Sequence, residues 1–260
     1  MDIADRLTNF PVGAAVTLGD LTGDVHPCLA RIRATEPVSW LPAIGGWLVT
    51  GRDHALAVLR DADSFTVDDP RFSTARVVGP SMLSTDGDDH ARHRAPFVGA
   101  FRHAVVMDGF EAWTAKKAGR LLAGHLAAGY CDLRAVLAAP LAVGVIARAL
   151  DLAEADPDRV LGWYRAIAAG VEGVNAGSDV GDGTRRAVAD LRRAVDRTVA
   201  DSAGSLLAEV AAGGSLTADE LFSNTAVLMF GAIETSEAMT ANALAHLLGS
   251  ADQLEAVAAD

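Results

Sequence analysis

The sequence has little cysteine and little positive charge. Its 260 residues include two cysteines, Cys28 and Cys131, too few for a disulfide framework and consistent with a reducing compartment. Against 34 acidic residues stand 22 basic ones, and the formal net charge of -12 argues against a general nucleic-acid-binding surface. The start of the chain lacks the basic, apolar pattern of a signal peptide, and no uncharged apolar run is long enough to span a bilayer. We therefore expect an acidic cytoplasmic protein.

Sheet signals are scarce as well. In the segment 37–50, PVSWLPAIGGWLVT, two runs rich in Val and Trp flank a proline and a Gly-Gly pair, which predicts a β-hairpin. Apolar periodicity predicts helices at 27–34, 52–60, 105–128, 133–150, 158–171, 185–202 and 205–212, whereas 1–25 reads as an irregular lead-in. The fold class is therefore mainly α with a small β-hairpin.

Two segments between the helices have no sustained period. Residues 65–85 carry two prolines and a glycine, and their apolar end predicts a loop that lines a pocket rather than a disordered segment. The joint 172–183, EGVNAGSDVGDG, holds four glycines, which predicts a mobile connection and makes 158–202 a helix–loop–helix lid.

One long stretch, 217–249, has clear helix boundaries. Thr217 with Glu220 three residues later forms a capping-box pattern, and Leu216 and Leu221 are placed as a hydrophobic staple. Gly249 is where a left-handed residue often ends a helix. A helix over this range is about 50 Å long, enough to run through the middle of a domain.

The middle of this helix is bare where a core helix carries large side chains. Gly231, Ala232, Glu234 and Thr235 follow an apolar stretch, and the Thr235 hydroxyl can bond back to the Gly231 carbonyl, loosening the helix and leaving room for a water. One interpretation is a ligand lying against the backbone, with Glu234 as a proton source. The other is a helix crossing point with Glu234 bonded to an arginine.

A second candidate site lies in DGDDHARHRAPFVGAF, 86–101. The acidic residues at its start suit a helix N-terminus, and Pro96 predicts a bend or restart. His90 and Arg94 are four residues apart and share a helical face. Such a pair can receive a carboxylate or phosphate, although at this spacing it is more often part of a solvated face.

Taken together, SMLSTDGDDHARHRAPF, the glycine-containing lid and FGAIETS in the long helix resemble the cytochrome P-450 family of haem-thiolate monooxygenases, of the soluble bacterial type. The resemblance runs in order from the hairpin to the end of the chain. It implies a single domain over 1–260, haem b with its propionates bound by His90 and Arg94, and dioxygen and haem lying over Gly231 and Ala232. Glu234 and Thr235 would deliver protons during dioxygen cleavage.

The sequence departs from the family pattern at several points. Ser236 replaces a commoner second Thr, and Ala95-Pro96 replaces a basic-apolar pair. The Glu-x-x-Arg pair and the loop with the iron-ligating cysteine are expected beyond Asp260, so the C-terminal part of the fold would be absent from this chain and no metal ligand lies within it. Neither cysteine has the surroundings of that ligand, and both are expected to be structural or partly exposed thiols.

The implied function is insertion of one oxygen atom into a mostly apolar small molecule, with electrons from NAD(P)H passed through a ferredoxin or flavodoxin-type partner. Arg92 and Arg102 could help to dock that partner. Candidate substrate-lining residues are Met82, Leu83, Val227 and Phe230. The alternatives are a truncated, non-catalytic ligand-binding or regulatory module derived from this fold, and a purely structural helical bundle, which leaves the order of the motifs unexplained.

Overall fold

The structure, a computed structural model, describes residues 2–125, 128–152 and 156–259. It divides into two compact units, Met1–Thr66 and Val67–Asp260, each of which is described by itself. Most described residues are helical and one two-stranded sheet is present among them, which confirms the predicted fold class. The single domain over 1–260 stays a prediction.

The first unit is built around the hairpin. Its elements are α1 (Ile3–Asn9), α2 (Pro11–Ala14), η1 (Gly19–Leu21), α3 (His26–Thr35), β1 (Val38–Leu41), η2 (Pro42–Ile44), β2 (Gly46–Val49) and α4 (Arg52–Arg60). The strands are antiparallel with Val38 opposite Val49, so the predicted hairpin is confirmed. The irregular lead-in was wrong, because Asp2 and Asp5 form a capping box that begins α1.

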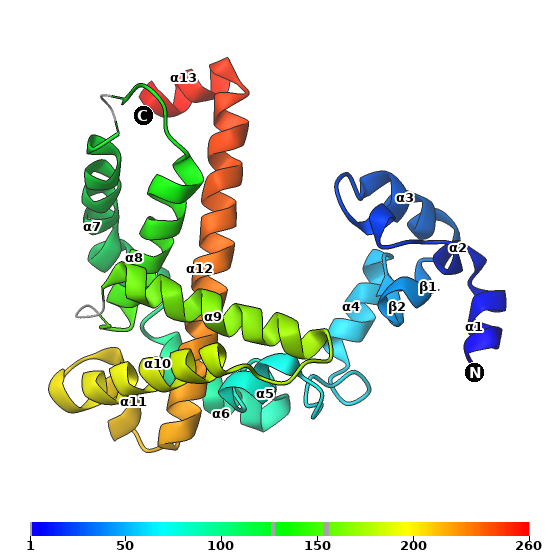
Figure 1. Cartoon of the computed structure of the whole chain (residues 1–260), viewed down its shortest axis with the longest axis horizontal. Helices are drawn as coiled ribbons and strands as arrows, with labels where there is room; N and C mark the ends of the chain where they lie inside the picture. Colours follow the sequence, from blue (N-terminus) through cyan, green and yellow to red (C-terminus); the bar gives the residue numbers. More distant parts are fainter. Residues whose placement is uncertain (1, 126–127, 153–155, 260) are drawn as a thin grey trace. The chain divides into compact units, whose positions relative to one another are not determined.

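The second unit contains the long helix and the helices packed on it (Figure 1). Its elements are α5 (Ser73–Val78), α6 (Gly87–Val98), α7 (His103–Ala123), the π-helical η4 (Arg134–Ala138), α8 (Ala139–Ala149), α9 (Pro157–Asn175), α10 (Asp182–Asp201), α11 (Leu206–Ala212), α12 (Ala218–Leu248) and α13 (Ala251–Ala259). Helix α5 lies inside 65–85, so that segment is less irregular than predicted. Pro96 stays within α6, and the predicted restart there is wrong.

Helix α12 begins as the sequence predicts. The Thr217 hydroxyl accepts from the Glu220 amide at 3.2 Å, and the Glu220 carboxylate accepts from the Thr217 amide at 2.9 Å. Leu216 and Leu221 are both buried, as expected of a staple. The end of the helix differs from the prediction, because Gly249 has φ -82 and is therefore right-handed.

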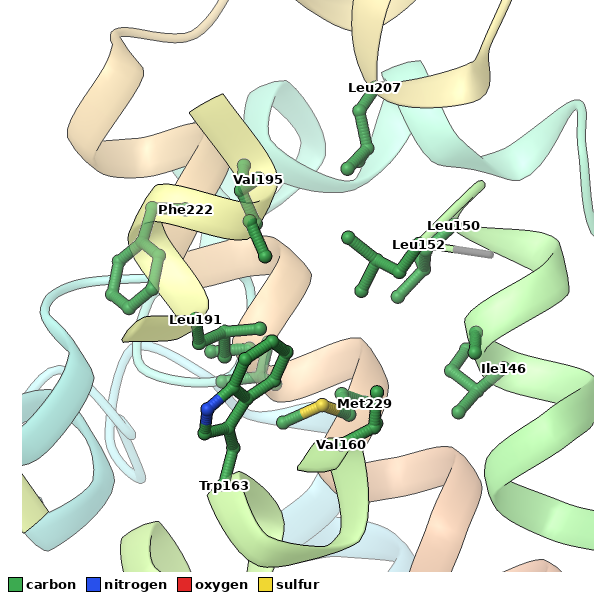
Figure 2. Packing of buried hydrophobic residues seen from close by; sticks show 14 of the residues in the cluster. Ile146, Leu150, Leu152, Val160, Trp163, Leu191, Val195, Leu207, Phe222 and Met229 are labelled. Atoms are coloured by element: carbon green, nitrogen blue, oxygen red, sulfur yellow. The ribbon is translucent and has the colours of Figure 1, made fainter. Parts of the chain in front are cut away.

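The main hydrophobic core of the second unit joins α8, α9, α10 and α12. Figure 2 shows Trp163 of α9, Leu191 of α10 and Met229 of α12 pointing toward one another in this cluster. Burial of each such side chain contributes on the order of 1.5–3 kcal/mol to the hydrophobic driving force. The core therefore fixes the two lid helices against the first half of α12.

Two sequence expectations concern the whole chain. In the described ranges, no helix has both the length and the apolar character needed to cross a membrane. Cys28 and Cys131 are free, half-buried thiols, as expected.

Candidate functional site

His90 lies on helix α6, and the loop before this helix holds its imidazole ring in place. The ring is half-buried, and its Nδ1 lies 2.8 Å from the carbonyl oxygen of Met82. A carbonyl can only accept a hydrogen bond, so Nδ1 carries the hydrogen and Nε2 is left for another partner. The residue predicted to bind an anion is therefore held in one orientation before any ligand arrives.

Arg94 lies one helical turn after His90 and is exposed. Its guanidinium group makes no hydrogen bond or ion pair with any residue that the structure describes. Its side chain lines a cavity of about 330 Å³ together with apolar neighbours, which are Met82, Phe97, Val98, Phe101 and Leu228. An unpaired cation in a cavity that is otherwise apolar suits a ligand with an anionic end and an apolar body, which the solvated-face interpretation does not explain.

The bare patch of α12 is open rather than filled by another helix. Gly231 is exposed, and a methyl group added to it would meet no atom within 4 Å. Gly170 of α9 shows what a crossing point looks like, because a methyl group there would collide with Thr184 of α10. Over the described residues, the crossing-point interpretation of Gly231 therefore fails, and the open surface fits a flat group lying against the backbone.

Thr235 and Glu234 lie beside this open surface, and both are exposed. The Thr235 hydroxyl donates to the Gly231 carbonyl, as predicted. Helix α12 nevertheless stays α-helical past this point, so the expected local loosening is not seen. The back-bond leaves the hydroxyl oxygen able to accept a hydrogen bond from a group above the helix.

Glu234 lies beside a tyrosine, and over the described residues it forms no ion pair with an arginine, which the crossing-point interpretation requires. Burial of Tyr164, followed by the charge and hydrogen bond of Glu234, raises the pKa of this phenol to about 12. The Tyr164 ring also packs on Phe230, with centroids 5.5 Å apart. The nearby Arg134 pairs with Glu237 at 2.7 Å instead.

The predicted substrate-lining residues fall in different environments. Met82 lines the cavity beside Arg94, and Phe230 lies against Tyr164 of the lid. Leu83 is 48% exposed, whereas Val227 is 7% exposed and belongs to the hydrophobic core. Val227 therefore has a structural role, and contact of these four residues with a substrate stays a prediction.

Sequence reasoning missed a buried polar cluster between α6 and α12. His93 is 2% exposed and Asn224 is fully buried, and the distance between Asn224 Nδ2 and His93 Nδ1 is 2.9 Å. Arg92 pairs with Glu220 at 2.8 Å, so its charge is engaged within the chain rather than free to dock a partner. The sequence feature that could have predicted this cluster is Asn224 itself, because a polar residue within an apolar helical segment needs a buried hydrogen-bond partner.

A further large cavity in the second unit does not coincide with the predicted site residues. A cavity of about 560 Å³ lies between α7 and α8, and none of the predicted site residues lines it. Among the residues described, no group of three or more His, Cys, Asp or Glu side chains is placed to hold a metal ion. An open helix surface at Gly231 and an arginine side chain without an ion-pair partner among the described residues are compatible with the distal face and the propionates of a haem, and these roles stay predictions.

No family model matches the chain. Among curated proteins, it is 28% identical over 265 residues to cytochrome P450 monooxygenase PikC of Streptomyces venezuelae, covering 93% of this chain and 60% of that protein. It is 33% identical over 166 residues to nocardicin C N-oxygenase of Nocardia uniformis subsp. tsuyamanensis, covering 57% of this chain and 38% of the relative. The chain thus spans about 60% or less of the length of these relatives.

Solved structures agree with these sequence matches. The crystal structure of CalO2 matches with a TM-score of 0.74 and 25% identity, covering 90% of this chain and 62% of that one. Further cytochrome P450 structures match with TM-scores from 0.65 to 0.74, although at lower identity they show the fold alone. The chain is therefore similar to bacterial cytochrome P450 monooxygenases, and over the part that it spans it has the cytochrome P450-like fold.

Proposed function

We propose that this chain forms the distal half of a haem pocket in a monooxygenase that inserts one oxygen atom into a mostly apolar small molecule. The observation that supports this most directly is the open surface at Gly231 beside Glu234 and Thr235. A structural helix gains nothing from a glycine there, because helical Gly costs about 1 kcal/mol relative to Ala. The position is useful if a bound group needs close approach to the backbone.

His90 and Arg94 would hold the anionic edge of the haem. Their positions on one face of α6 allow both to reach propionate groups, and Arg94 can make two parallel hydrogen bonds to a carboxylate. Arg94 is exposed and lines an otherwise apolar cavity, so its guanidinium group is accessible to such a carboxylate. These two contacts would set the orientation of the macrocycle along α12.

Thr235 and Glu234 would hold and move protons above Gly231. Haem b, when bound, supplies the binding and reductive activation of dioxygen. The Thr235 hydroxyl donates to the Gly231 carbonyl, so its oxygen can accept a hydrogen bond from a water above the helix. Glu234 is exposed and would exchange protons with solvent, and a turn of its side chain away from Tyr164 would bring its carboxyl group toward the Thr235 hydroxyl.

The remaining parts of this proposal are a cysteine thiolate ligand from outside these residues, a ferredoxin or flavodoxin-type partner that passes electrons from NAD(P)H, and a cytoplasmic location. Arg102 has no partner among the described residues and remains available for such docking, unlike Arg92. The substrate would lie near Met82, Leu83 and Phe230, under the α9–α10 lid.

The decisive measurement is the visible spectrum of the polypeptide made from its natural reading frame, reduced and exposed to carbon monoxide. A Soret band far to the red of that of a His-ligated haem is the expected result. A His90→Ala, Arg94→Ala double variant should lose most of this band, while His103→Ala, at the start of α7, should keep it. A natural polypeptide without any Soret band would refute the proposal.

The second candidate is a non-catalytic binding module, which the apolar cavity beside Arg94 favours. In that case a hydrophobic carboxylate would bind and raise the thermal stability, but no haem band would form. Titration with a fatty acid, read together with the haem spectrum, separates the two functions, because only the haem function produces a Soret band; Arg94→Ala is the control for binding in the cavity.

A further inference from the structure

The side-chain amide of Asn224 is fully buried and has only one possible orientation. Its Oδ1 lies 2.8 Å from the amide nitrogen of Met82, and its Nδ2 lies 2.7 Å from the carbonyl oxygen of Glu220. The first backbone group can only donate and the second can only accept. The two partners therefore determine which end of the Asn224 amide is oxygen and which is nitrogen.

This orientation determines the tautomer of His93. The second hydrogen of Asn224 Nδ2 points to His93 Nδ1 at 2.9 Å, so this ring nitrogen must accept. A neutral His93 then carries its hydrogen on Nε2, which lies 3.3 Å from the Glu220 carboxylate. Arg92 Nη2 also lies 3.1 Å from this Nε2, but both atoms are then donors, so this contact is not a hydrogen bond, and Arg92 Nη2 donates to the Glu220 carboxylate at 2.8 Å.

The peptide of Met82 connects this buried cluster to the candidate haem contact. Its amide donates to Asn224, and its carbonyl accepts from His90 Nδ1. His90 and His93 therefore carry their hydrogens on opposite ring nitrogens, although they lie three residues apart on α6. The loop before α6 is fixed to the buried half of α12 by Asn224, over a separation of 142 residues.

We propose that Asn224 is the positioning residue for His90: by holding the Met82 peptide, it fixes the imidazole with Nδ1 engaged and Nε2 presented to an anionic group. The proposal rests on the proposed function in that the anionic group is a haem propionate. The positioning itself is a property of this chain, so it can be measured without haem. A partner that fixes the ring and tautomer of a binding histidine commonly changes the affinity of the site about 10-fold or more.

The test uses the 260-residue chain and the ¹⁵N resonances of its histidine rings. In the wild type, His90 should be protonated on Nδ1 and His93 on Nε2. Asn224→Leu removes the acceptor for Met82, and His90 should then lose its single tautomer and show averaged ring resonances. A His90 that keeps the hydrogen on Nδ1 in folded Asn224→Leu would overturn the proposal, because Asn224 would then be merely structural.

Asn224→Asp provides a second variant that keeps the shape of the side chain. One carboxylate oxygen can still accept from Met82, so His90 should keep its tautomer. The other oxygen replaces Nδ2 and can only accept, so His93 should now carry a hydrogen on Nδ1. Retention of the wild-type His93 tautomer would contradict the assigned network. His93→Phe is the matched control, since it leaves the Met82 contact intact and should not change His90.

Hemin titration of the polypeptide made from the natural reading frame, with the same substitutions, separates this proposal from the proposed function. Asn224→Leu should bind hemin about 10-fold more weakly than the wild type, with Asn224→Asp close to the wild type. If the wild type binds no hemin while the His90 resonances respond as described, the haem function fails and the positioning stands. If the wild type and Asn224→Leu bind hemin equally, the positioning fails and the haem function stands.

Discussion

The two halves of α12 have opposite surroundings although they belong to one continuous helix. In the first half, every residue from Leu221 to Val227 is buried, including three consecutive polar ones. In the second half, from Glu234 onward, the side chains are exposed or half-buried, and Met239 is 73% exposed. The open patch at Gly231 lies at the boundary. The first half therefore anchors the helix, and the proposed site lies at the edge of that rigid support.

The neighbours of each half explain the difference. Ser223 donates to the Val78 carbonyl of α5 at 2.7 Å, and Arg192 of α10 lies over the Phe222 ring at 4.3 Å. In the second half, the ion pair between Glu237 and Arg134 reaches η4, and α8 runs beside α12 in Figure 1. Other helices thus surround the first half of α12, whereas fewer sides of its second half are covered by other helices.

The largest predicted effect tests the anchoring role. Phe222→Ala removes a ring that is 1% exposed and should lower the free energy of unfolding by about 3–5 kcal/mol, because it leaves a cavity. Met239→Ala, in the second half, should change it by no more than about 0.5 kcal/mol. Denaturant unfolding followed by circular dichroism measures both, and equal losses would remove the distinction between the halves.

The next prediction concerns the boundary. Gly231→Ala should raise the free energy of unfolding by about 0.5–1 kcal/mol, because alanine favours the helix and meets open space. Gly170→Ala should lower it by about 1–3 kcal/mol, because the added methyl collides with Thr184. A loss of stability in Gly231→Ala would mean that the patch is filled within the chain, contrary to the proposed haem contact.

A smaller effect concerns the pH dependence of the anchor. The hydrogen bond from Arg92, with those from Thr217, lowers the pKa of Glu220 from 4.5 to about 2. A carboxyl group with a lowered pKa in the folded state stabilises the fold above its unfolded pKa, and this contribution is lost as pH falls from about 4.5 to about 2. Glu220→Gln should cost about 1 kcal/mol at neutral pH and nothing near pH 2.

Thermal unfolding across this pH range measures the Glu220 effect. Asp219→Asn is the control, because Asp219 lies in the same turn but is 85% exposed in its pair with Arg192. A pH-independent difference between wild type and Glu220→Gln would show that the helix cap, rather than the charge, carries the stabilisation.

How much the sequence could predict also differs between the halves. The capping box and the Gly231–Thr235 back-bond follow from local spacing, which is why both are confirmed. The tertiary partners of Glu234 and Asn224 depend on which helices cross α12, and periodicity carries no such information. The lead-in helices were missed because they are short, and α1 begins at a capping box and α2 at Pro11 rather than with an apolar repeat. The placement of His90 and Arg94 on one face follows from their four-residue spacing, whereas the loop contact of His90 needed the structure, and the binding role of the pair stays a prediction.

The smallest predicted effect lies in the second half, at the bond between Tyr164 and Glu234. Burial and the Glu234 carboxylate raise the pKa of Tyr164 to about 12, so this phenol stabilises the fold up to about pH 10 and loses that contribution as pH rises toward 12. Glu234→Gln should lower the pKa of Tyr164. The ultraviolet absorbance of the phenolate measures this shift in a Tyr130→Phe background, which leaves Tyr164 as the one tyrosine because the sequence contains two. Tyr164→Phe should change the free energy of unfolding by about 0.5 kcal/mol at neutral pH, because one partly exposed hydrogen bond is lost. If instead Tyr164→Phe cost several kcal/mol, Glu234 would be part of the anchor, and the boundary between the halves would have to move past it toward the C-terminus of α12.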